Sequence, residues 1–537
     1  MADHKTVMAQ AVREAYERGQ EDETLLPLVL TGPGSRPLGR IRDGDAVIFY
    51  NIRGEREIEL TRSLVEKGFP FFPVRAFDRL SFATMIEYAP QLPVQVAFPP
   101  EGEVEMTLSE VISRRGLGQL KVTEAEKAVH VGYFLNGKRQ EPFAGEERVI
   151  VPTRKDVTLF DAAPEMSIAG IVAAVRERIS DGGVSFILVN FPNVDVVGHI
   201  ENETAVRRAV EAVDRAAGEV LEAALRAGMT TVITADHGTV EKWLYPEGTV
   251  DTGHTDSPVP FLLVSPGGGE SLRPEGTLTD VAPTILDLLG IEKPPAMTGR
   301  SLLTSRVPRD GGAPRRVLMM ILDGWGYRAE RDGNLIAASH TPVMDRLWAS
   351  RPRSLLAAAG EAVGLPPGTV GNSEAGHLHI GAGRVIYSDR VRIDRAIEDG
   401  SFYENRAFRG VMGEAKGQGG ALHLMGIVSF FSSHGSLHHL FALLDLARRE
   451  GVGEVYIHAM LGRRGELPAS GARYVEQVER YCLEKGVGRV ASVIGRYWSM
   501  DREDNWDRIE KTYRMLVYGE GTPVPDGFSS ANVAQWR

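Results

Sequence analysis

The stretch VSFILVNFPNVDVVGH, residues 184–199, places an acid and a histidine shortly after a run of apolar residues. The run Val184–Phe191 has the length and apolar content of a strand buried in a sheet. Asp195 and His199 follow it within a few residues. The stretch therefore predicts a polar site at the carboxyl end of a strand, where open parallel sheets bind their ligands.

Two further strand-like runs lead into acidic residues in the same way. Thr231–Thr234 leads into ADHG, which carries Asp236 and His237, and Val317–Leu322 leads into DGWG, which begins with Asp323. Because the carboxyl ends of parallel strands share one edge of a sheet, we expect the three acid-bearing ends to converge.

Carboxylates and imidazoles in this combination are typical of a metal site. A further histidine, His254, lies in the loop TGHTDSPVP. Each motif alone is weak, since an isolated Asp-x-x-x-His is more often a surface or capping pair. Taken together they favour a centre for two divalent ions, with Mn as the first candidate and Zn, Co or Mg as alternatives. Two such ions can activate a nucleophile and hold a phosphoryl group during its transfer.

Short apolar runs alternate with helical patterns along the chain, which favours α/β domains with parallel sheets. A chain of 537 residues is too long for one ordinary core, so two domains are expected. The longest helical pattern fills Thr204–Ala227. The remaining strand-like runs are Ala46–Tyr50, Phe261–Val264, Leu422–Gly426, Val455–His458 and Val490–Ile494, and the remaining helical patterns are Leu437–Arg449 and Ala472–Lys485.

Composition excludes several classes of protein. Hydrophobic residues make up 43% and charged residues 25%, which is typical of a globular protein. The net charge of −11 argues against nucleic acid or an anionic membrane as a partner. The N-terminal residues predict a polar amphipathic helix and not a signal peptide, and no apolar run is long enough to cross a bilayer. The single cysteine, Cys482, cannot form an internal disulfide and fits a reducing compartment, so a cytoplasmic location is expected. The chain is also expected to be a monomer.

A glycine-rich segment offers a candidate nucleophile. GTVGNSEAGHLHIGAGR, residues 368–384, places Ser373 where a helix is expected to begin. Backbone N–H groups at a helix N-terminus would stabilise a phosphorylated serine, but a serine at this point is also a common helix cap. Serine needs a base or a metal to become nucleophilic, and the predicted metal centre would supply that activation. We therefore predict phosphoryl transfer through Ser373.

Longer motifs extend along the chain: NIRGER (51–56), EAEKAVHV (124–131), DVVGH (195–199), TADHG (234–238), GHTDSPVP (253–260), ILDGWG (321–326), TPVMDRLW (341–348), GEAVGLPPGTVGNSEAGH (360–377), RIDRAIEDGSF (392–402) and IGRYWSMDREDNWDR (494–508). In these motifs the chain resembles the cofactor-independent (2,3-bisphosphoglycerate-independent) phosphoglycerate mutases of the alkaline phosphatase superfamily. The resemblance covers nearly the whole chain.

The order of the motifs differs from the order in that family, where ILDGWG lies near the N-terminus and TADHG near the C-terminus. Here the family's beginning starts at about Arg315, so the resemblance implies a circular permutation with a linker at about residues 304–314. It implies a phosphatase-like metal-binding domain with a parallel sheet at 101–387. A smaller α/β phosphotransferase-like domain would combine residues 1–100 with residues 388–537.

The resemblance also implies roles for individual residues. The substrate would be a small phosphorylated carboxylic acid, and arginine forks suit both of its anionic groups. One metal would be held by Asp195, His199 and His254, and the other by Asp323, Ser373, Asp236 and His237. The substrate-binding residues would be Arg53, Arg56, Lys127, His434, Arg464, Arg496 and Arg502, of which Arg464 would also be catalytic.

Two motifs depart from the family pattern. The loop FFSSHGSLHH (430–439) keeps His434 but lacks the glycines before it, and Ser436 stands where the family has a second histidine. The segment GRRGELP (462–468) keeps Arg464 but has Gly465 in place of an aspartate expected to act on the substrate hydroxyl, with Glu466 adjacent.

Three functions are compatible with these features. The first is a mutase that interconverts 3-phosphoglycerate and 2-phosphoglycerate through a phosphoserine. The second keeps the metal and serine chemistry but changes the acceptor, as in a phosphatase or a mutase for a phosphonate or other phosphoglycerate analogue. The third is a non-catalytic binding protein, against which the seven filled metal-ligand positions argue.

Overall fold

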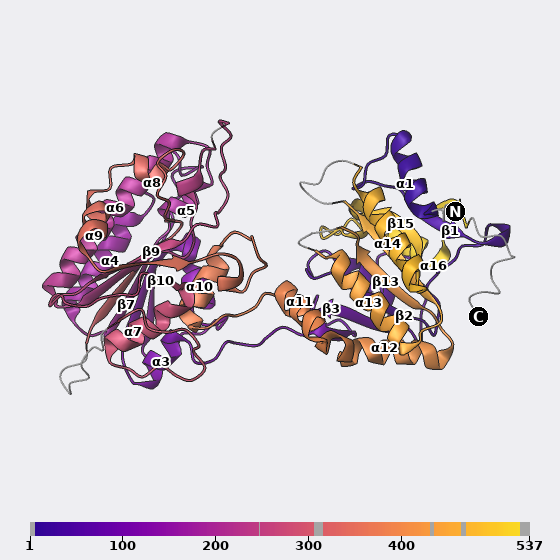
Figure 1. Cartoon of the computed structure of the whole chain (residues 1–537), viewed down its shortest axis with the longest axis horizontal. Helices are drawn as coiled ribbons and strands as arrows, with labels where there is room; N and C mark the ends of the chain where they lie inside the picture. The colour runs from indigo at the N-terminus through magenta and orange to yellow at the C-terminus, as the bar shows by residue number, and fades with distance from the viewer. Residues whose placement is uncertain (1–5, 246, 305–314, 430–433, 463–468, 527–537) are drawn as a thin grey trace. The chain divides into compact units, whose positions relative to one another are not determined.

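The computed structural model describes residues 6–245, 247–304, 315–429, 434–462 and 469–526, and the chain divides into two compact units (Figure 1). Unit 1 is drawn from residues 1–100 and 392–537, and unit 2 from residues 101–391. Most of the predicted linker, residues 305–314, lies outside the described residues, as do Arg464, Gly465 and Glu466. It stays a prediction that residues 101–387 form a phosphatase-like domain and that residues 1–100 and 388–537 form a phosphotransferase-like domain.

Unit 2 is built on an eight-stranded sheet in the order β10-β12-β9-β8-β11-β7-β5-β6. The sheet is parallel except at β9, which runs antiparallel to both of its neighbours. The strands are β5 (Gln119–Glu124), β6 (Glu146–Val151), β7 (Phe186–Phe191), β8 (Thr230–Thr234), β9 (Val259–Val264), β10 (Glu275–Thr277), β11 (Val317–Leu322) and β12 (Arg353–Ala357).

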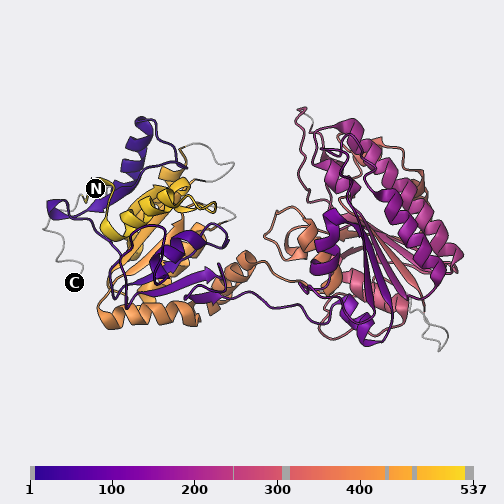
Figure 2. The same cartoon turned by 180° about the vertical axis from the view of Figure 1, so that it is seen from behind.

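Helices cover both faces of this sheet. The pair α4 and α6 packs on one face, and α3 and α7 contact strands of the other face, with α10 packed against them (Figures 1 and 2). Strand β11 is buried along its whole length, which explains its unbroken apolar sequence VLMMIL. The helices are α3 (Leu108–Arg114), α4 (Ile168–Asp181), α5 (Asn193–Gly198), α6 (Glu203–Arg226), α7 (Val281–Leu289), α8 (Leu335–Ala338), α9 (Pro342–Ser350) and α10 (Ser373–Ala382).

Unit 1 contains a second eight-stranded sheet, in the order β16-β1-β15-β14-β13-β2-β3-β4. Strands from early and late parts of the chain lie side by side, since β2 pairs with β13 in parallel and β1 lies between β15 and β16. The strands are β1 (Leu28–Thr31), β2 (Ala46–Phe49), β3 (Ser81–Ile86), β4 (Gln95–Phe98), β13 (Leu422–Ile427), β14 (Val455–Leu461), β15 (Arg489–Gly495) and β16 (Thr522–Pro525).

The helices of unit 1 also lie on both faces of its sheet. Helix α14 packs against both α1 and α13, and α13 also packs against α12. Helices α2 and α15 both pack against α16. Their bounds are α1 (Val7–Glu17), α2 (Ile58–Val65), α11 (Asp389–Asp399), α12 (Arg406–Gln418), α13 (Leu437–Glu450), α14 (Gly471–Lys485), α15 (Arg496–Ser499) and α16 (Trp506–Tyr518).

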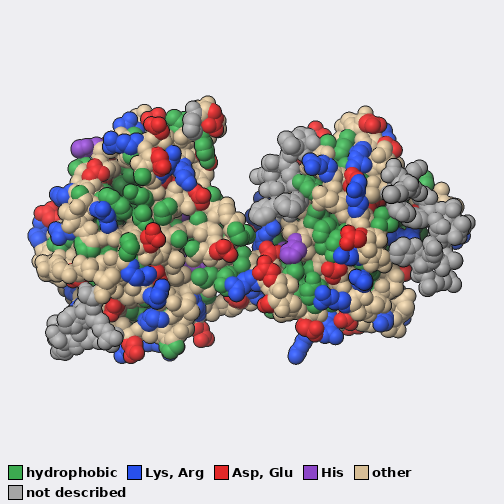
Figure 3. Space-filling model, viewed as in Figure 1, with side chains coloured by type: hydrophobic (Ala, Val, Ile, Leu, Met, Phe, Trp, Pro, Cys, Tyr) green, Lys and Arg blue, Asp and Glu red, His purple; other side chains and the backbone are tan. Residues whose placement is uncertain are grey.

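The predicted α/β class with two parallel-rich sheets is confirmed. Each predicted strand-like run coincides with a strand to within a few residues, and the predicted helix Thr204–Ala227 is α6. On the face shown in Figure 3, acidic and basic side chains are intermixed on each unit. Within the described ranges, no helix is both long and apolar enough to span a membrane.

Candidate metal centre

The three acid-bearing strand ends meet at one edge of the unit 2 sheet. Strand β11 lies between β8 and β7, all three are parallel, and the register sets Leu322 opposite Phe191. Asp323 follows β11 directly, Asp236 comes two residues after β8, and Asp195 lies in the first turn of α5 behind β7. The predicted convergence is confirmed.

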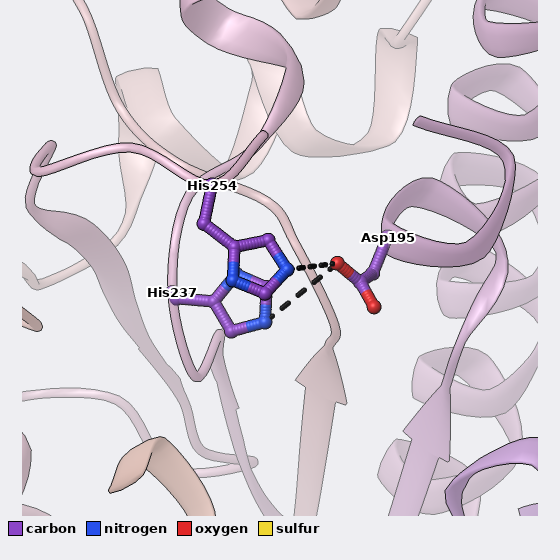
Figure 4. Close-up of side chains that lie close together, drawn as sticks. All are labelled: Asp195, His237 and His254. Atoms are coloured by element: carbon purple, nitrogen blue, oxygen red, sulfur yellow. Dashed lines mark ion pairs between the residues drawn. The ribbon is translucent and has the colours of Figure 1, made fainter. Parts of the chain in front are cut away.

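Two groups of side chains at this edge have the spacing of metal ligands. The first contains Asp195, His237 and His254, whose ligand atoms all lie within 4.8 Å of one another. Figure 4 shows both imidazole rings facing the Asp195 carboxylate, with Nε2 of His254 3.1 Å and Nε2 of His237 3.7 Å from Oδ1. His199 adjoins this group, because its Nε2 lies 3.3 Å from the same oxygen and its Nδ1 lies 2.7 Å from the carbonyl oxygen of Thr252.

The second group contains Asp236, Asp323 and His377, all buried. Nδ1 of His377 lies 3.2 Å from Oδ2 of Asp236, and Asn190 on β7 donates a 2.8 Å hydrogen bond to Oδ2 of Asp323. Sequence reasoning did not single out His377. The signal was its position four residues after Ser373, which places both side chains on one side of a helix.

Ser373 lies between these groups as the first residue of α10. Its Oγ is 2.9 Å from Nε2 of His237 and 3.5 Å from Oδ1 of Asp323. The cap of α10 is Asn372, whose side-chain oxygen accepts a 2.8 Å hydrogen bond from the backbone N–H of Ala375. All seven predicted metal-binding residues therefore lie at one edge of the sheet, with His237 and Ser373 close to members of both groups.

Lys127, predicted to bind substrate, is also part of this centre. Its ammonium donates hydrogen bonds to Ser373 Oγ at 2.6 Å and to Asp195 Oδ2 at 2.7 Å, and it lies 2.7 Å from Asp323 Oδ1. Burial alone would lower the pKa of Lys127, but the carboxylates of Asp323, Asp195 and Asp236 raise it above its ordinary value. The lysine therefore holds its positive charge among three buried carboxylates.

The same environment shifts the pKa values of Asp323 and Asp236 in opposite directions. Burial raises the pKa of Asp323, and the neighbouring Asp236 carboxylate raises it further. Burial acts on Asp236 in the same direction, but His237 and His377 outweigh it and hold the pKa of Asp236 below its ordinary value. The centre therefore concentrates negative charge that favours cations.

The donor set fits divalent metal ions. Carboxylate oxygens and imidazole nitrogens are ligands that Mn and Zn accept. In addition, Oδ2 of Asp236 is buried and accepts no hydrogen bond from any described residue, although the ring of His377 is near. A buried carboxylate oxygen without a hydrogen-bond donor is costly unless a cation completes its environment.

The predicted substrate-binding residues that lie in unit 1 and are described follow the carboxyl ends of its parallel strands, and they are Arg53, Arg56, His434, Arg496 and Arg502. Arg496 begins α15 directly behind β15, and its guanidinium pairs with Glu23 at 3.0 Å. Arg53 and Arg502 both pair with Glu55, at 3.5 and 2.9 Å. Arg56 follows β2, donates to the carbonyl oxygen of Met500 at 3.1 Å and adjoins Glu57, whose carboxylate contacts His434. These arginines thus lie where ligands bind in this fold class, and three of them are paired with glutamates.

Comparisons with known proteins agree with this description. The profile of the metalloenzyme superfamily matches residues 15–293, just over half of the chain, and the profile "BPG-independent PGAM N-terminus" matches residues 393–534. A 2,3-bisphosphoglycerate-independent phosphoglycerate mutase of Syntrophotalea carbinolica is 43% identical over 297 residues, which is 55% of this chain and 57% of that protein. One from Moorella thermoacetica is 53% identical over 207 residues, 38% of this chain and 40% of that protein.

A crystal structure of Leishmania mexicana phosphoglycerate mutase at low cobalt concentration aligns with a TM-score of 0.36 and 30% identity, covering 51% of this chain and 53% of that one. The chain spans about half the length of these curated relatives, from 40% to 57%. The family resemblance predicted from the motifs is confirmed by both profiles and by these relatives. The chain belongs to the metalloenzyme superfamily.

Proposed function

We propose that this protein is a metal-dependent phosphoglycerate mutase that carries the phosphoryl group on Ser373. The observation that supports this most directly is the environment of its hydroxyl, which lies 2.6 Å from the Lys127 ammonium and 2.9 Å from His237 beside the buried Asp323. A buried serine at a helix N-terminus beside a cation and an imidazole is suited to act as a nucleophile toward a phosphorus atom.

The proposed metal ligands are the two sets implied by the family, with His377 as an additional candidate beside Asp236 and Asp323. When bound, divalent ions would supply positive charge that favours the deprotonated serine and offsets charge on the phosphoryl oxygens. Manganese is the first candidate. Asn190 and His377 contact the carboxylates of Asp323 and Asp236, and such contacts orient ligands.

Within this function the chain's own groups have distinct tasks. Lys127 binds phosphoryl oxygens and holds a proton beside Ser373 Oγ, and the N-terminus of α10 presents backbone N–H groups to a phosphorylated Ser373. The arginines of unit 1 bind the carboxylate and phosphate of the glycerate, replacing the pairs that they form with Glu23 and Glu55. Arg464, outside the described residues, is proposed to join them.

We further propose that the chain is a circular permutant whose phosphotransferase-like part combines residues 1–100 with 388–537. This is supported by the mutase N-terminal profile, which matches residues 393–534 after the superfamily profile at 15–293. Pairing of β2 with β13 supports it as well. A cytoplasmic location and a monomeric state belong to the same proposal.

Phosphorus NMR tests the proposed function in one spectrum. Protein loaded with Mn and then separated from free metal is mixed with 3-phosphoglycerate, and 2-phosphoglycerate is the expected product. Elemental analysis of the same sample should find about two ions per chain, one for each ligand group. Absence of any conversion together with absence of bound metal would contradict the proposal.

One sequence feature favours a second candidate, in which water or another molecule accepts the phosphoryl group. Gly465 replaces the aspartate that the family is expected to use on the substrate hydroxyl. Release of inorganic phosphate in the same spectrum would identify a phosphatase. No reaction with phosphoglycerate, but transfer with a phosphonate analogue, would identify a mutase of altered specificity.

A further inference from the structure

A buried carboxylate links the loop of His237 to the loop of His254, the two histidines of the first metal-ligand group. Glu241, in the 3₁₀ turn that follows β8, is fully buried. Its Oε2 accepts a 3.0 Å hydrogen bond from the backbone N–H of Thr239, two residues after His237. Its Oε1 accepts a hydrogen bond from the hydroxyl of Thr255, which directly follows His254. One side chain of unit 2 therefore bonds to both loops that carry these ligands.

Further hydrogen bonds extend from these two threonines to the ligands themselves. The hydroxyl of Thr239 donates at 3.4 Å to Oδ1 of Asp195, the oxygen that both imidazole rings face (Figure 4). The carbonyl oxygen of Thr255 accepts a 3.1 Å bond from the backbone N–H of Gly371, whose own carbonyl oxygen lies 3.0 Å from Nδ1 of His254. A carbonyl oxygen only accepts, so Nδ1 is the donor and the lone pair of the neutral ring resides on Nε2, toward Asp195.

Two glycines leave the space that the Glu241 carboxylate occupies. A Cβ at Gly326 would overlap its carboxyl carbon, and a Cβ at Gly238 would overlap its Oε1. Neither glycine has a φ in the left-handed region, so the backbone conformation does not require glycine at these positions. The two residues end the motifs DGWG and ADHG, each of which carries a predicted metal ligand. Both motifs are therefore fitted to a carboxylate at position 241.

We propose that Glu241 is a positioning residue that fixes His237 and His254 for a divalent ion at the first metal-ligand group. This inference rests on the metal centre of the proposed function and is independent of the phosphoryl acceptor. Imidazoles that are already oriented bind a metal more tightly, and residues that orient ligands contribute to affinity without touching the ion. Both donors to Glu241 are neutral groups, so its negative charge also favours a cation at this group.

Manganese titrations followed by EPR in the absence of substrate measure metal affinity separately from catalysis. In Glu241→Ala the dissociation constant of one site should rise about 10–100-fold, while that of the other should change less than about threefold. Glu241→Gln should recover part of the affinity, because an amide can still bond both threonines. Asp214→Ala is the matched control, since Asp214 is also a fully buried carboxylate of unit 2 and accepts from the backbone N–H groups of Val343 and Met344. It should lower stability but leave both affinities unchanged.

A second pair of variants tests the link with a smaller change and decides the inference if Glu241→Ala does not fold. Thr255→Val removes a hydroxyl that donates to Glu241 and accepts a backbone N–H at 3.3 Å. The buried Thr284 is its match, because that hydroxyl donates to the carbonyl oxygen of Asp280 at 2.6 Å and accepts from the backbone N–H of Leu302 at 2.9 Å. Thr255→Val should weaken the same site as Glu241→Ala, whereas Thr284→Val should weaken neither.

Double variants identify which site is weakened. His254→Gln removes a ligand of the first group, so adding Glu241→Ala to it should have much less effect than in wild type. On His377→Gln, in the second group, the effect of Glu241→Ala should be undiminished. Wild-type affinities in Glu241→Ala, or an equal loss in Asp214→Ala, would overturn the inference. Wild type that binds no Mn would overturn it together with the metal-dependent function. If wild type binds Mn but transfers no phosphoryl group, the proposed function fails, and the Mn affinities still decide the inference.

Discussion

Lys127 is the residue on which the charge balance of the candidate metal centre depends most. Its ammonium contacts Asp195, Asp323 and Ser373, so replacing it with the similarly shaped Met leaves buried carboxylates without their cation. We expect Lys127→Met to destabilise metal-free unit 2 by about 3–5 kcal/mol, the usual effect of removing one partner of a buried ion pair. Added Mn should restore much of this loss, as measured by thermal unfolding with and without Mn.

Lys121 provides the control for that experiment. It is also fully buried in unit 2, where it pairs with Glu146 at 3.2 Å and bonds Asn136. Lys121→Met should be destabilised to a similar extent, but Mn should stabilise it no more than wild type because Glu146 lies outside the metal-ligand groups. Equal rescue of both variants would contradict the assignment of Lys127 to the metal centre.

A second prediction at the level of a single residue concerns Ser373. Ser373→Ala removes the protein atom proposed to bond to phosphorus, so phosphoryl transfer should fall by a factor of about a thousand or more. The melting temperature and the amount of bound metal should change little, since Ser373 contributes one ligand among several. Ser257→Ala, a buried serine of the same unit, is the control and should keep its activity. Substantial turnover by Ser373→Ala would rule out a phosphoserine.

Among the elements, α10 links stability to the site because its cap residue adjoins Ser373. Asn372 caps the helix by accepting from the backbone N–H of Ala375. Asn372→Ala should cost about 0.5–2 kcal/mol and also lower the transfer rate, whereas Asn372→Asp should retain the cap. Thr107→Ala removes the cap of α3 in the same unit and should lower stability without changing the rate. Denaturant titrations and initial rates measure both, and equal rates for the two alanine variants would contradict this role of α10.

The central strands of unit 1 carry a buried hydrogen-bonded chain that predicts sensitivity to acid. His423 on β13 lies 3.1 Å from Asp45 and 3.0 Å from His458 on β14, whose other ring nitrogen bonds Ser492 on β15 at 2.8 Å. Burial lowers the pKa of His458 well below 6.5, and the neighbouring His423 lowers it further. Burial would raise the pKa of Asp45, but its hydrogen bonds, the one with His423 first, lower it.

The lowered pKa values of His458 and Asp45 both make unit 1 less stable as the pH falls. Below about pH 6.5 the unfolded chain binds a proton that folded His458 does not, and at lower pH the unfolded chain binds one that folded Asp45 does not. The free energy of unfolding of unit 1 should therefore fall as the pH drops from about 6.5. Hydrogen exchange of β13 and β14 at pH 8 and pH 5 measures this, and His458→Gln should show a smaller difference. An unchanged difference would exclude His458 as a source.

At the scale of the whole molecule, the proposed permutation predicts that the two parts of the chain can exchange their order along the sequence without loss of the fold. A rearranged chain would begin at Arg315, join residue 537 to residue 1 through a short Gly/Ser linker, and end at Thr304. The helix α1 packs on β16, so a short linker suffices. We expect the rearranged protein to fold, to bind the same number of metal ions and to keep its transfer rate within about tenfold, since the packed elements are unchanged. Failure to fold, with wild type folding under the same conditions, would contradict the permutation.

Much of this protein is determined locally by its sequence. The run Val317–Leu322 coincides with β11, and its unbroken apolar sequence is typical of a short strand covered on both faces. Asp195, Asp236 and Asp323 were recognised because each follows such a run. Their convergence was predictable because parallel strands end at a common edge.

Tertiary structure alone decided the partners of these residues. Lys127 and Ser373 are 246 positions apart, and Glu57 and His434 are 377 positions apart, yet each pair is in hydrogen-bond contact. Neither contact, nor the inclusion of His377, follows from a local pattern, because apolar periodicity specifies which face of an element is buried and not which element covers it. That choice is made when β11 packs between β7 and β8, and when β2 pairs with β13, because the free energy of burial depends on the packing of the whole unit.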